Sequence, residues 1–255
     1  MRIIFITGND LRHFHMVKCF SKYFKKFKWI VEKRDISLDH NKLVKTSDSY
    51  SKHIKNFKKE QKVLFNKATN FYKRNKDEII HLERKKVNPI EFTKRISDEI
   101  NTFKPCVLIS YGCQKIDISK IKKKSLRCFN VHGGLLPYYR GVNTNFWPHM
   151  NLESNYIGLT LHEISSKIDS GKIFFQTTVD VNKSDTINKL SCRAIKIFSN
   201  IVPGKVHKLL INNFNKNGVV VKNKYRAYTK KDFKPKFIKV AYQNVDIFKK
   251  LENKK

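Results

Sequence analysis

The chain has 255 residues, of which 40% are hydrophobic and 29% charged, and its formal net charge is +33 at pH 7. That length allows one or two domains with a buried core, and the composition is that of a globular protein rather than a disordered one. No run of 18 apolar residues occurs, which argues against a membrane-spanning helix. An acid follows the short apolar opening MRIIFITGND, so we expect no signal peptide.

The first half of the chain predicts strands alternating with helices. Residues 2–7 (RIIFIT) form an apolar run that ends at a Gly-Asn-Asp turn, so they predict a buried strand, followed by an amphipathic helix over residues 11–26. A second strand is expected near KWIVEKR (28–34). Between Ser47 and Arg74, apolar residues recur at helical spacing and predict one long helix or two. Pro89 is suited to the first turn of a helix over residues 89–103.

The second half continues the alternation and adds a tail. KPCVLISYG (104–112) and LRCFNVH (126–132) predict two strands, and IGLTLHEI (157–164) and KIFFQTTVDV (172–181) predict two shorter ones. A helix capped by Ser184 should run through residue 202. We therefore expect an α/β fold: a Rossmann-like, mostly parallel sheet with flanking helices. This catalytic domain spans residues 1–208, and a small C-terminal appendage with a hairpin near 218–228 spans residues 209–255.

The cysteines and the charge bear on environment and partners. Five cysteines are scattered with no CxxC pair, which favours reduced thiols in the cytoplasm and no metal site. The excess of lysine has two interpretations. It can be a surface for anionic partners such as nucleic acid or phosphorylated substrates. It can also be compositional drift, since lysine greatly outnumbers arginine and is spread over most of the chain.

One stretch, FNVHGGLLPYYRG (129–141), contains only a single charged residue and combines unusual residue types. Asn130 and His132 lie two positions apart at the end of a predicted strand, so their side chains should project from the same face. About thirty residues later, SKIDSGK places Asp169 in a tight loop. An amide, an imidazole and a carboxylate are the groups that acyl transfer to an amine needs. Each motif alone is weak, and the residue types by themselves leave catalytic and structural interpretations equally open.

The three motifs together resemble the folate-dependent formyltransferases. That family has a strand ending in Asn-x-His, a Leu-Leu-Pro-x-(Tyr/Trp)-Arg-Gly run and a (Leu/Ile)-Asp-(Thr/Ser)-Gly loop, and all three stand here in order over residues 105–200. The resemblance is greatest to the sugar N-formyltransferases. In one departure, Gly134 occupies a position that is often serine in the family.

The resemblance implies a role for each matching residue. Asn130 would polarise the formyl oxygen of N10-formyltetrahydrofolate, His132 would assist proton transfer, and Asp169 would hold the geometry and the protonation state. No metal is implied. The turn after the preceding strand and the Asp169 loop would contribute backbone groups to the folate slot, and the Leu-Leu-Pro run would form its apolar wall. The predicted folate-binding residues are Tyr111, Gly112, Gln114, Ile116, Leu135, Leu136, Pro137 and Ile168.

The amine acceptor is expected to be a small molecule, a nucleotide-linked amino sugar used for surface polysaccharides. Only about fifty residues follow the last long helix, too few for the tRNA-binding barrel of the methionyl-tRNA enzymes, and TGNDLRHFH lacks the glycine-rich phosphate loop of the glycinamide ribonucleotide enzymes. Arg12 and Arg140 would meet phosphates or would be ordinary surface residues. His162, near the Asp169 loop, is a third substrate-binding candidate. A nucleic-acid-borne amine, a catalytically silent binding protein and a homodimer remain open alternatives.

Overall fold

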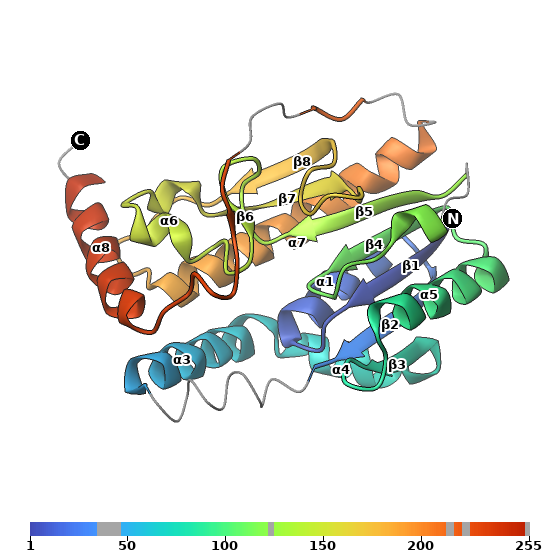
Figure 1. Cartoon of the computed structure of the whole chain (residues 1–255), viewed down its shortest axis with the longest axis horizontal. Helices are drawn as coiled ribbons and strands as arrows, with labels where there is room; N and C mark the ends of the chain where they lie inside the picture. Colours follow the sequence, from blue (N-terminus) through green and yellow to red (C-terminus); the bar gives the residue numbers. More distant parts are fainter. Residues whose placement is uncertain (35–46, 122–124, 213–216, 221–224, 253–255) are drawn as a thin grey trace.

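The fold is built on one seven-stranded sheet, seen in a computed structural model that describes residues 1–34, 47–121, 125–212, 217–220 and 225–252 (Figure 1). The strand order is β3-β2-β1-β4-β5-β7-β8, and every neighbouring pair from β3 to β5 is parallel, whereas β7 and β8 are antiparallel. The strands are β1 (Arg2–Thr7), β2 (Lys26–Lys33), β3 (Ile79–Glu83), β4 (Val107–Tyr111), β5 (Arg127–His132), β7 (Gly158–Glu163) and β8 (Ile173–Thr178). The predicted fold class is confirmed.

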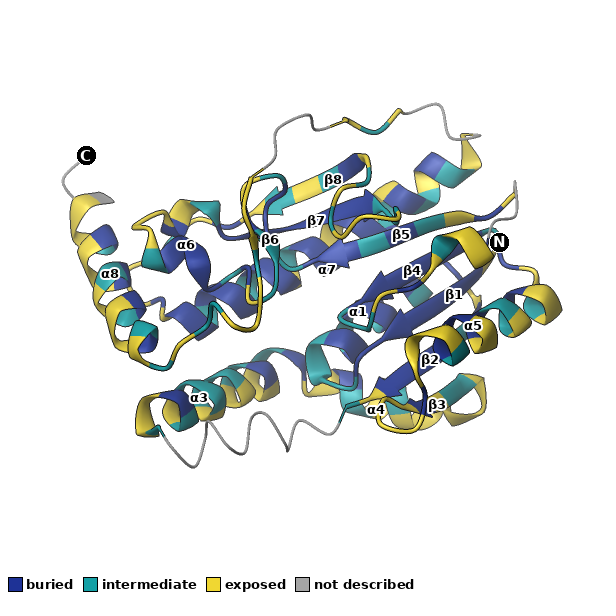
Figure 2. Ribbon diagram, viewed as in Figure 1, coloured by how far each residue is buried: buried dark blue, intermediate teal, exposed yellow. Residues whose placement is uncertain are grey.

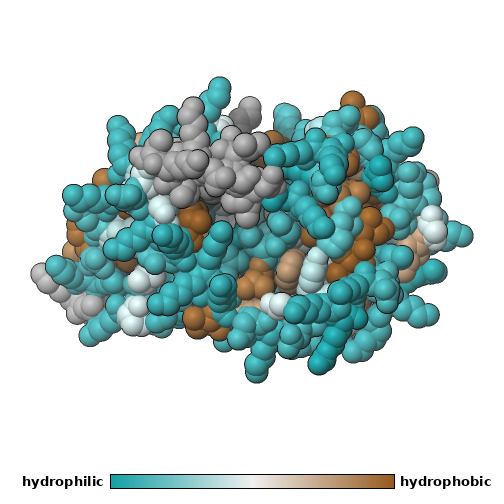
Figure 3. Space-filling view, turned by 90° about the horizontal axis from the view of Figure 1, so that it is seen from below, coloured by the Kyte–Doolittle hydropathy of each residue, from teal (hydrophilic) through white to brown (hydrophobic). Residues whose placement is uncertain are grey.

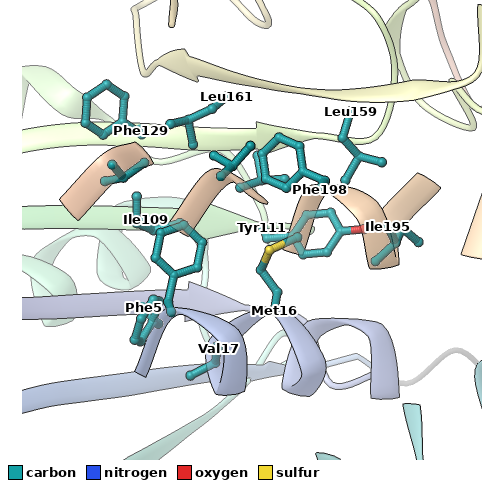
Figure 4. Packing of buried hydrophobic residues seen from close by; sticks show 14 of the residues in the cluster. Phe5, Met16, Val17, Ile109, Tyr111, Phe129, Leu159, Leu161, Ile195 and Phe198 are labelled. Carbon is teal, nitrogen blue, oxygen red and sulfur yellow. The ribbon is translucent and has the colours of Figure 1, made fainter. Parts of the chain in front are cut away.

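Helices cover both faces of this sheet. The longest, α7 (Ile187–Ile211), packs with α1 (Leu11–Ser21) on one face, and α5 (Pro89–Phe103) covers the other. In Figure 4, Met16 and Val17 of α1 and Phe198 of α7 lie against strand residues such as Ile109 and Phe129. Burial of this much aliphatic and aromatic surface is the main force that holds the layers together. Figure 2 shows the central strands buried along their length while the helices expose one side.

Local sequence explains most helix boundaries. Asn88 caps α5 by accepting hydrogen bonds from the N–H groups of Ile90 and Glu91, and Pro89 follows in the first turn, as expected. The apolar stretch between Ser47 and Arg74 forms two helices, α3 (Asp48–Phe65) and α4 (Lys67–Arg74). The bounds of α1 and α7 differ from the prediction. Helix α1 ends at Ser21 because β2 already begins at Lys26, and α7 is capped by Thr186 rather than by Ser184 and continues to Ile211 rather than to residue 202.

The C-terminal part packs onto the rest of the chain. Helix α8 (Lys236–Glu252) lies against α3 and the short helix α6 (Trp147–Met150) through a third cluster of buried residues. Strand β9 (Ala227–Tyr228) pairs in parallel with β6 (Arg140–Gly141), which follows the Leu-Leu-Pro run in the sequence. The predicted hairpin falls partly outside the described residues. Its described flanks pair elsewhere, because Val219 bridges Ile173 and Tyr228 pairs with Gly141.

Hydrophilic residues predominate on the face shown in Figure 3, and apolar residues form scattered patches on it. Exposed lysines recur along α3, for example Lys52, Lys55 and Lys59. Among the residues that the structure describes, three short 3-10 helices occur, at Lys76–Glu78, Ile118–Lys120 and Ser154–Tyr156. None of the helices that the structure describes is long and apolar enough to cross a membrane.

Candidate active site

The Asn-x-His pair lies at the carboxyl end of β5, in the middle of the sheet. Phe129 and Val131 alternate with this pair and belong to the cluster beneath α1 and α7. Because side chains alternate across a strand, Asn130 and His132 face the opposite side of the sheet, the side that α5 covers. Ligands of open α/β sheets bind beyond the carboxyl ends of the strands, which is where this pair stands.

His132 is held in one orientation by the backbone. Its Nε2 lies 2.7 Å from the carbonyl oxygen of Tyr139. A carbonyl only accepts hydrogen bonds, so Nε2 carries a proton and Nδ1 is the atom that can gain one. Nδ1 lies 3.4 Å from Oδ1 of Asp169. Burial lowers the pKa of His132, although the Asp169 carboxylate and the Tyr139 carbonyl oppose that shift. A proton gained at Nδ1 would therefore lie against a carboxylate.

Asp169 comes from the loop between β7 and β8, and it is ionised. Burial raises the pKa of this carboxyl, but hydrogen bonding and charge from His162 and His132, together with the Gly141 N–H, outweigh burial and lower the pKa to about 2. The Gly141 N–H donates to Oδ2 at 2.9 Å. Asp169 itself has a φ of 49°, a left-handed conformation that few non-glycine residues adopt. The three residues predicted as catalytic are thus brought together.

The predicted substrate-binding residues have different surroundings. Arg140 donates one terminal amino group to the Ile168 carbonyl at 2.8 Å and the other to the Tyr225 carbonyl at 3.3 Å, so it ties the Asp169 loop to the segment before β9. Arg12 forms an ion pair with Asp10 at 2.5 Å and packs over the ring of Phe57. Both guanidinium groups already have protein partners. Their assignment to substrate phosphates stays a prediction.

His162 and a residue that sequence reasoning missed both contact Asn130. The Asn130 Nδ2 lies 3.1 Å from Nε2 of His162, and the Ser110 hydroxyl donates to the Asn130 Oδ1 at 2.8 Å. Ser110 lies beside Asn130 because β4 pairs with β5 in a register that sets these two residues opposite each other. A polar residue near the end of a predicted buried strand was the available signal for it.

The residues predicted to bind folate surround the same end of the sheet. Leu135 and Leu136 are buried, Pro137 is half-buried, and Ile168 is exposed. The Gln114 N–H donates to the buried carboxylate of Glu32, which anchors the turn after β4. That turn contains Gly112, whose positive φ of 62° and close approach to the His13 ring exclude a side chain. The side chain of Tyr111 points toward α7 (Figure 4), and its hydroxyl group is hydrogen-bonded to Arg12.

A cavity of about 270 Å³ opens beside the predicted folate-binding turn. It is bordered by Ile116 from that turn, by Ser166 from the Asp169 loop and by Thr93 of α5, with Lys115 and Lys120 at its margin. No group of three or more metal-ligating side chains occurs within the described parts of the chain. The cavity thus borders both loops that the sequence assigned to the folate slot, but none of Asn130, His132 and Asp169 lines it.

Gly141 lies where the C-terminal segment packs beside this site, through the pairing of β6 with β9. Its φ is 91°, and a Cβ there would lie 2.0 Å from the carbonyl oxygen of Tyr228. We expect Gly141→Ala to separate β6 from β9, to displace the N–H that Asp169 accepts, and to destabilise the fold by about 2 kcal/mol or more. Turnover should fall at least about tenfold, since small displacements of catalytic groups are costly. Thermal melts and steady-state kinetics measure both effects.

The control for this substitution is Gly204→Ala. Gly204 lies inside α7, and an added Cβ would meet only the end of the Tyr23 side chain at 3.0 Å. Alanine favours a helix interior over glycine by up to about 1 kcal/mol, so this variant should be as stable as the parent or more so. Equal stability and activity for both alanine variants would contradict the argument about Gly141.

The comparisons with known proteins identify the family to which the chain belongs. The formyl transferase family matches residues 41–206, more than half of the chain, and the chain belongs to that family. Among curated relatives, the bifunctional polymyxin resistance protein ArnA of Wigglesworthia glossinidia brevipalpis is 37% identical over 110 residues, covering 40% of this chain and 16% of that protein. Methionyl-tRNA formyltransferase of a Thermotoga species is 27% identical over 169 residues, covering 56% of this chain and 51% of that enzyme.

A solved structure extends the likeness over nearly the whole fold. An N-formyltransferase from Helicobacter canadensis, in complex with folinic acid and dTDP-3-aminofucose, superposes with a TM-score of 0.60 at 19% identity. The match covers 98% of this chain and 82% of that one. The chain therefore shares the formyltransferase fold from its first strand to its C-terminal helix. It spans about half or less of the length of the two curated relatives.

Proposed function

We propose that the chain is a folate-dependent N-formyltransferase that formylates the amine of a nucleotide-linked amino sugar. The observation that carries this proposal is that three groups lie together at the carboxyl end of β5. Asn130 has an amide N–H to offer, His132 has a free Nδ1, and Asp169 is an ionised carboxylate 3.4 Å from that nitrogen. Catalysis of acyl transfer needs an oxyanion donor, a proton acceptor and a group that stabilises the resulting cation.

N10-formyltetrahydrofolate would bind between the turn after β4 and the Asp169 loop, with its formyl group at Asn130, and the cavity lined by Ile116 and Ser166 borders both of these loops. That cosubstrate supplies the formyl group. Asn130 donates to the formyl oxygen as negative charge develops there during attack by the amine. His132 takes the amine proton at Nδ1, beside Asp169, and returns it to the leaving nitrogen. One C–N bond forms, another breaks, and the proton count balances.

The amino-sugar acceptor is supported by the comparison over the whole fold. The Helicobacter canadensis protein that matches 98% of this chain was solved with a dTDP-linked amino sugar and folinic acid. The positive charge of +33 would attract a nucleotide diphosphate. In this proposal the reaction takes place in the cytoplasm, in keeping with the scattered cysteines, and its product serves surface polysaccharide synthesis.

A second candidate is a methionyl-tRNA-like enzyme. It is favoured by the sequence match to the Thermotoga enzyme and by the same positive charge, which would also attract tRNA. A tRNA complex would weaken steeply with salt, because each phosphate contact releases counterions. A sugar nucleotide with few charges would show a much shallower dependence.

The test is turnover with defined acceptors. The purified chain would be mixed with N10-formyltetrahydrofolate and separately with dTDP- or UDP-linked 3-amino and 4-amino sugars or with aminoacylated initiator tRNA, and tetrahydrofolate release would be followed by absorbance. We expect release with one class of amino sugar. Release with the tRNA alone would establish the second candidate. Folate binding with no release from any acceptor would leave the fold assignment intact and refute the proposed acceptor class.

A further inference from the structure

Three polar side chains form a row across neighbouring strands at the proposed oxyanion donor. Asn130 of β5 is the direct partner of Ser110 in β4 and of His162 in β7. Directly opposed residues on one face of a sheet have their Cβ atoms about 5 Å apart, so their side chains are in reach of one another. Ser110 and His162 are both buried, at 3% and 2% exposure, which removes water as a competing partner.

The hydrogen bonds in this row have a defined direction. Nδ1 of His162 lies 2.8 Å from the carbonyl oxygen of Glu163, and a carbonyl only accepts, so Nδ1 carries the proton. In the neutral ring Nε2 is then an acceptor, and the group that approaches it at 3.1 Å must be the NH₂ of Asn130. The amide oxygen turns the other way, toward the Ser110 hydroxyl, which donates to it at 2.8 Å.

Orientation matters because an asparagine amide has nearly the same shape after a half-turn. In the orientation seen here, one N–H is used by His162 and the second is available for the formyl oxygen. In the reversed orientation, a carbonyl oxygen would face the developing oxyanion and repel it. Asp169 Oδ1 lies 3.6 Å from the same Nε2, and it would accept a hydrogen bond from His162 only when the ring is protonated. In the neutral ring the partner of Nε2 is the Asn130 amide, at 3.1 Å.

We propose that Ser110 and His162 are positioning residues that select and hold the productive orientation of the Asn130 amide. His162 sets the direction through its fixed tautomer, and Ser110 completes the row by donating to the amide oxygen. This inference rests on the proposed function, since it assigns Asn130 the role of oxyanion donor. It gives His162 a role inside the protein rather than in substrate recognition.

The kinetic test is a mutant cycle in the full chain. Ser110→Ala should lower kcat about tenfold, because small misplacements of a catalytic group are costly, while KM for the folate changes less than about twofold. In an Asn130→Ala background the same Ser110→Ala substitution should cost nothing further. Ser199→Ala, which removes another buried hydroxyl that bonds to a helix carbonyl at 2.7 Å, should leave kcat unchanged. An equal loss with and without Asn130, or no loss in the parent, would overturn the proposal.

A second measurement needs no activity. Long-range proton–nitrogen NMR on protein labelled with ¹⁵N-histidine, with His162→Gln to assign the signal, reports which ring nitrogen of His162 is protonated at neutral pH. We expect the Nδ1–H form. The Nε2–H form would reverse the amide and refute the inference, whether or not the chain turns over an amino sugar. Absence of turnover in the parent protein, with the Nδ1–H form present, would count against the proposed function alone.

Discussion

Asn130→Ala should lower kcat by about a hundred- to a thousandfold, the usual loss when one oxyanion donor is removed. Asn130 lies between Ser110 and His162, and its amide supplies the N–H group that would donate to the oxyanion. Folate affinity should change little, because the amide acts on charge that develops only in the transition state. Tetrahydrofolate release under saturating conditions gives kcat, and quenching of intrinsic fluorescence gives folate affinity.

A matched control is Asn75→Ala. Asn75 is also partly buried and donates one hydrogen bond through its amide, to the Phe71 carbonyl at 2.7 Å, but it ends α4 away from the carboxyl edge of β5. Its loss should reduce stability modestly and leave kcat within about twofold, because no transition-state contact is removed. If Asn130→Ala retained more than a tenth of the parental kcat, the oxyanion role of Asn130 would be refuted.

The sequence predicted where the candidate catalytic residues lie in the fold, because local pattern and motif agreed. Asn130 and His132 stand at the end of an apolar strand, and strand periodicity alone places both on one face. Asp169 stands in a short loop between two alternating strands. The approach of Asp169 to His132, by contrast, depends on β7 pairing with β5, and long-range pairing of this kind has no local signal.

Strand β3, helix α8 and the pairing of β9 with β6 were not predicted from the sequence. Strand β3 is only five residues long and contains His81 and Glu83, so its pattern is weak. Helix α8 had a readable signal in Ile238, Ala241 and Val245, which are spaced as on one helix face, but the lysine-rich background obscured it. The contribution of the tail to the site, through β9 and Gly141, could not be predicted, because a two-residue strand pair leaves no periodic pattern.

Buried histidines should make the fold sensitive to mild acid. Burial, as the main cause, lowers the pKa of His149 to about 3 and those of His15 and His53 to about 4, and it lowers the pKa of His13 and His132 as well. Each folded-state pKa lies below the unfolded value of 6.5, so the unfolded chain binds more protons. The free energy of unfolding is therefore unaffected by these groups above pH 6.5. As the pH falls from 6.5 toward 4, it decreases by about 1.4 kcal/mol per pH unit for each titrating histidine.

Chemical denaturation at pH 7, 6 and 5 measures this slope, and a substitution can assign it. His149 is fully buried, and its Nδ1 lies 2.8 Å from the Ser154 hydroxyl. His149→Gln removes one titrating group, so the free energy of unfolding should fall less steeply below pH 6.5 even if the variant is less stable throughout. His81 serves as the comparison: it is exposed, although burial and then Lys33 lower its pKa as well, so His81→Gln should change the slope less than His149→Gln. The carboxylate of Asp169 is separable from this effect. Its pKa of about 2 lies below the unfolded value of 3.8, so its stabilisation is present above pH 3.8 and is lost only as the pH falls from there toward 2. An unchanged slope in His149→Gln would therefore mean that burial of neutral histidine does not set the acid limit of this fold.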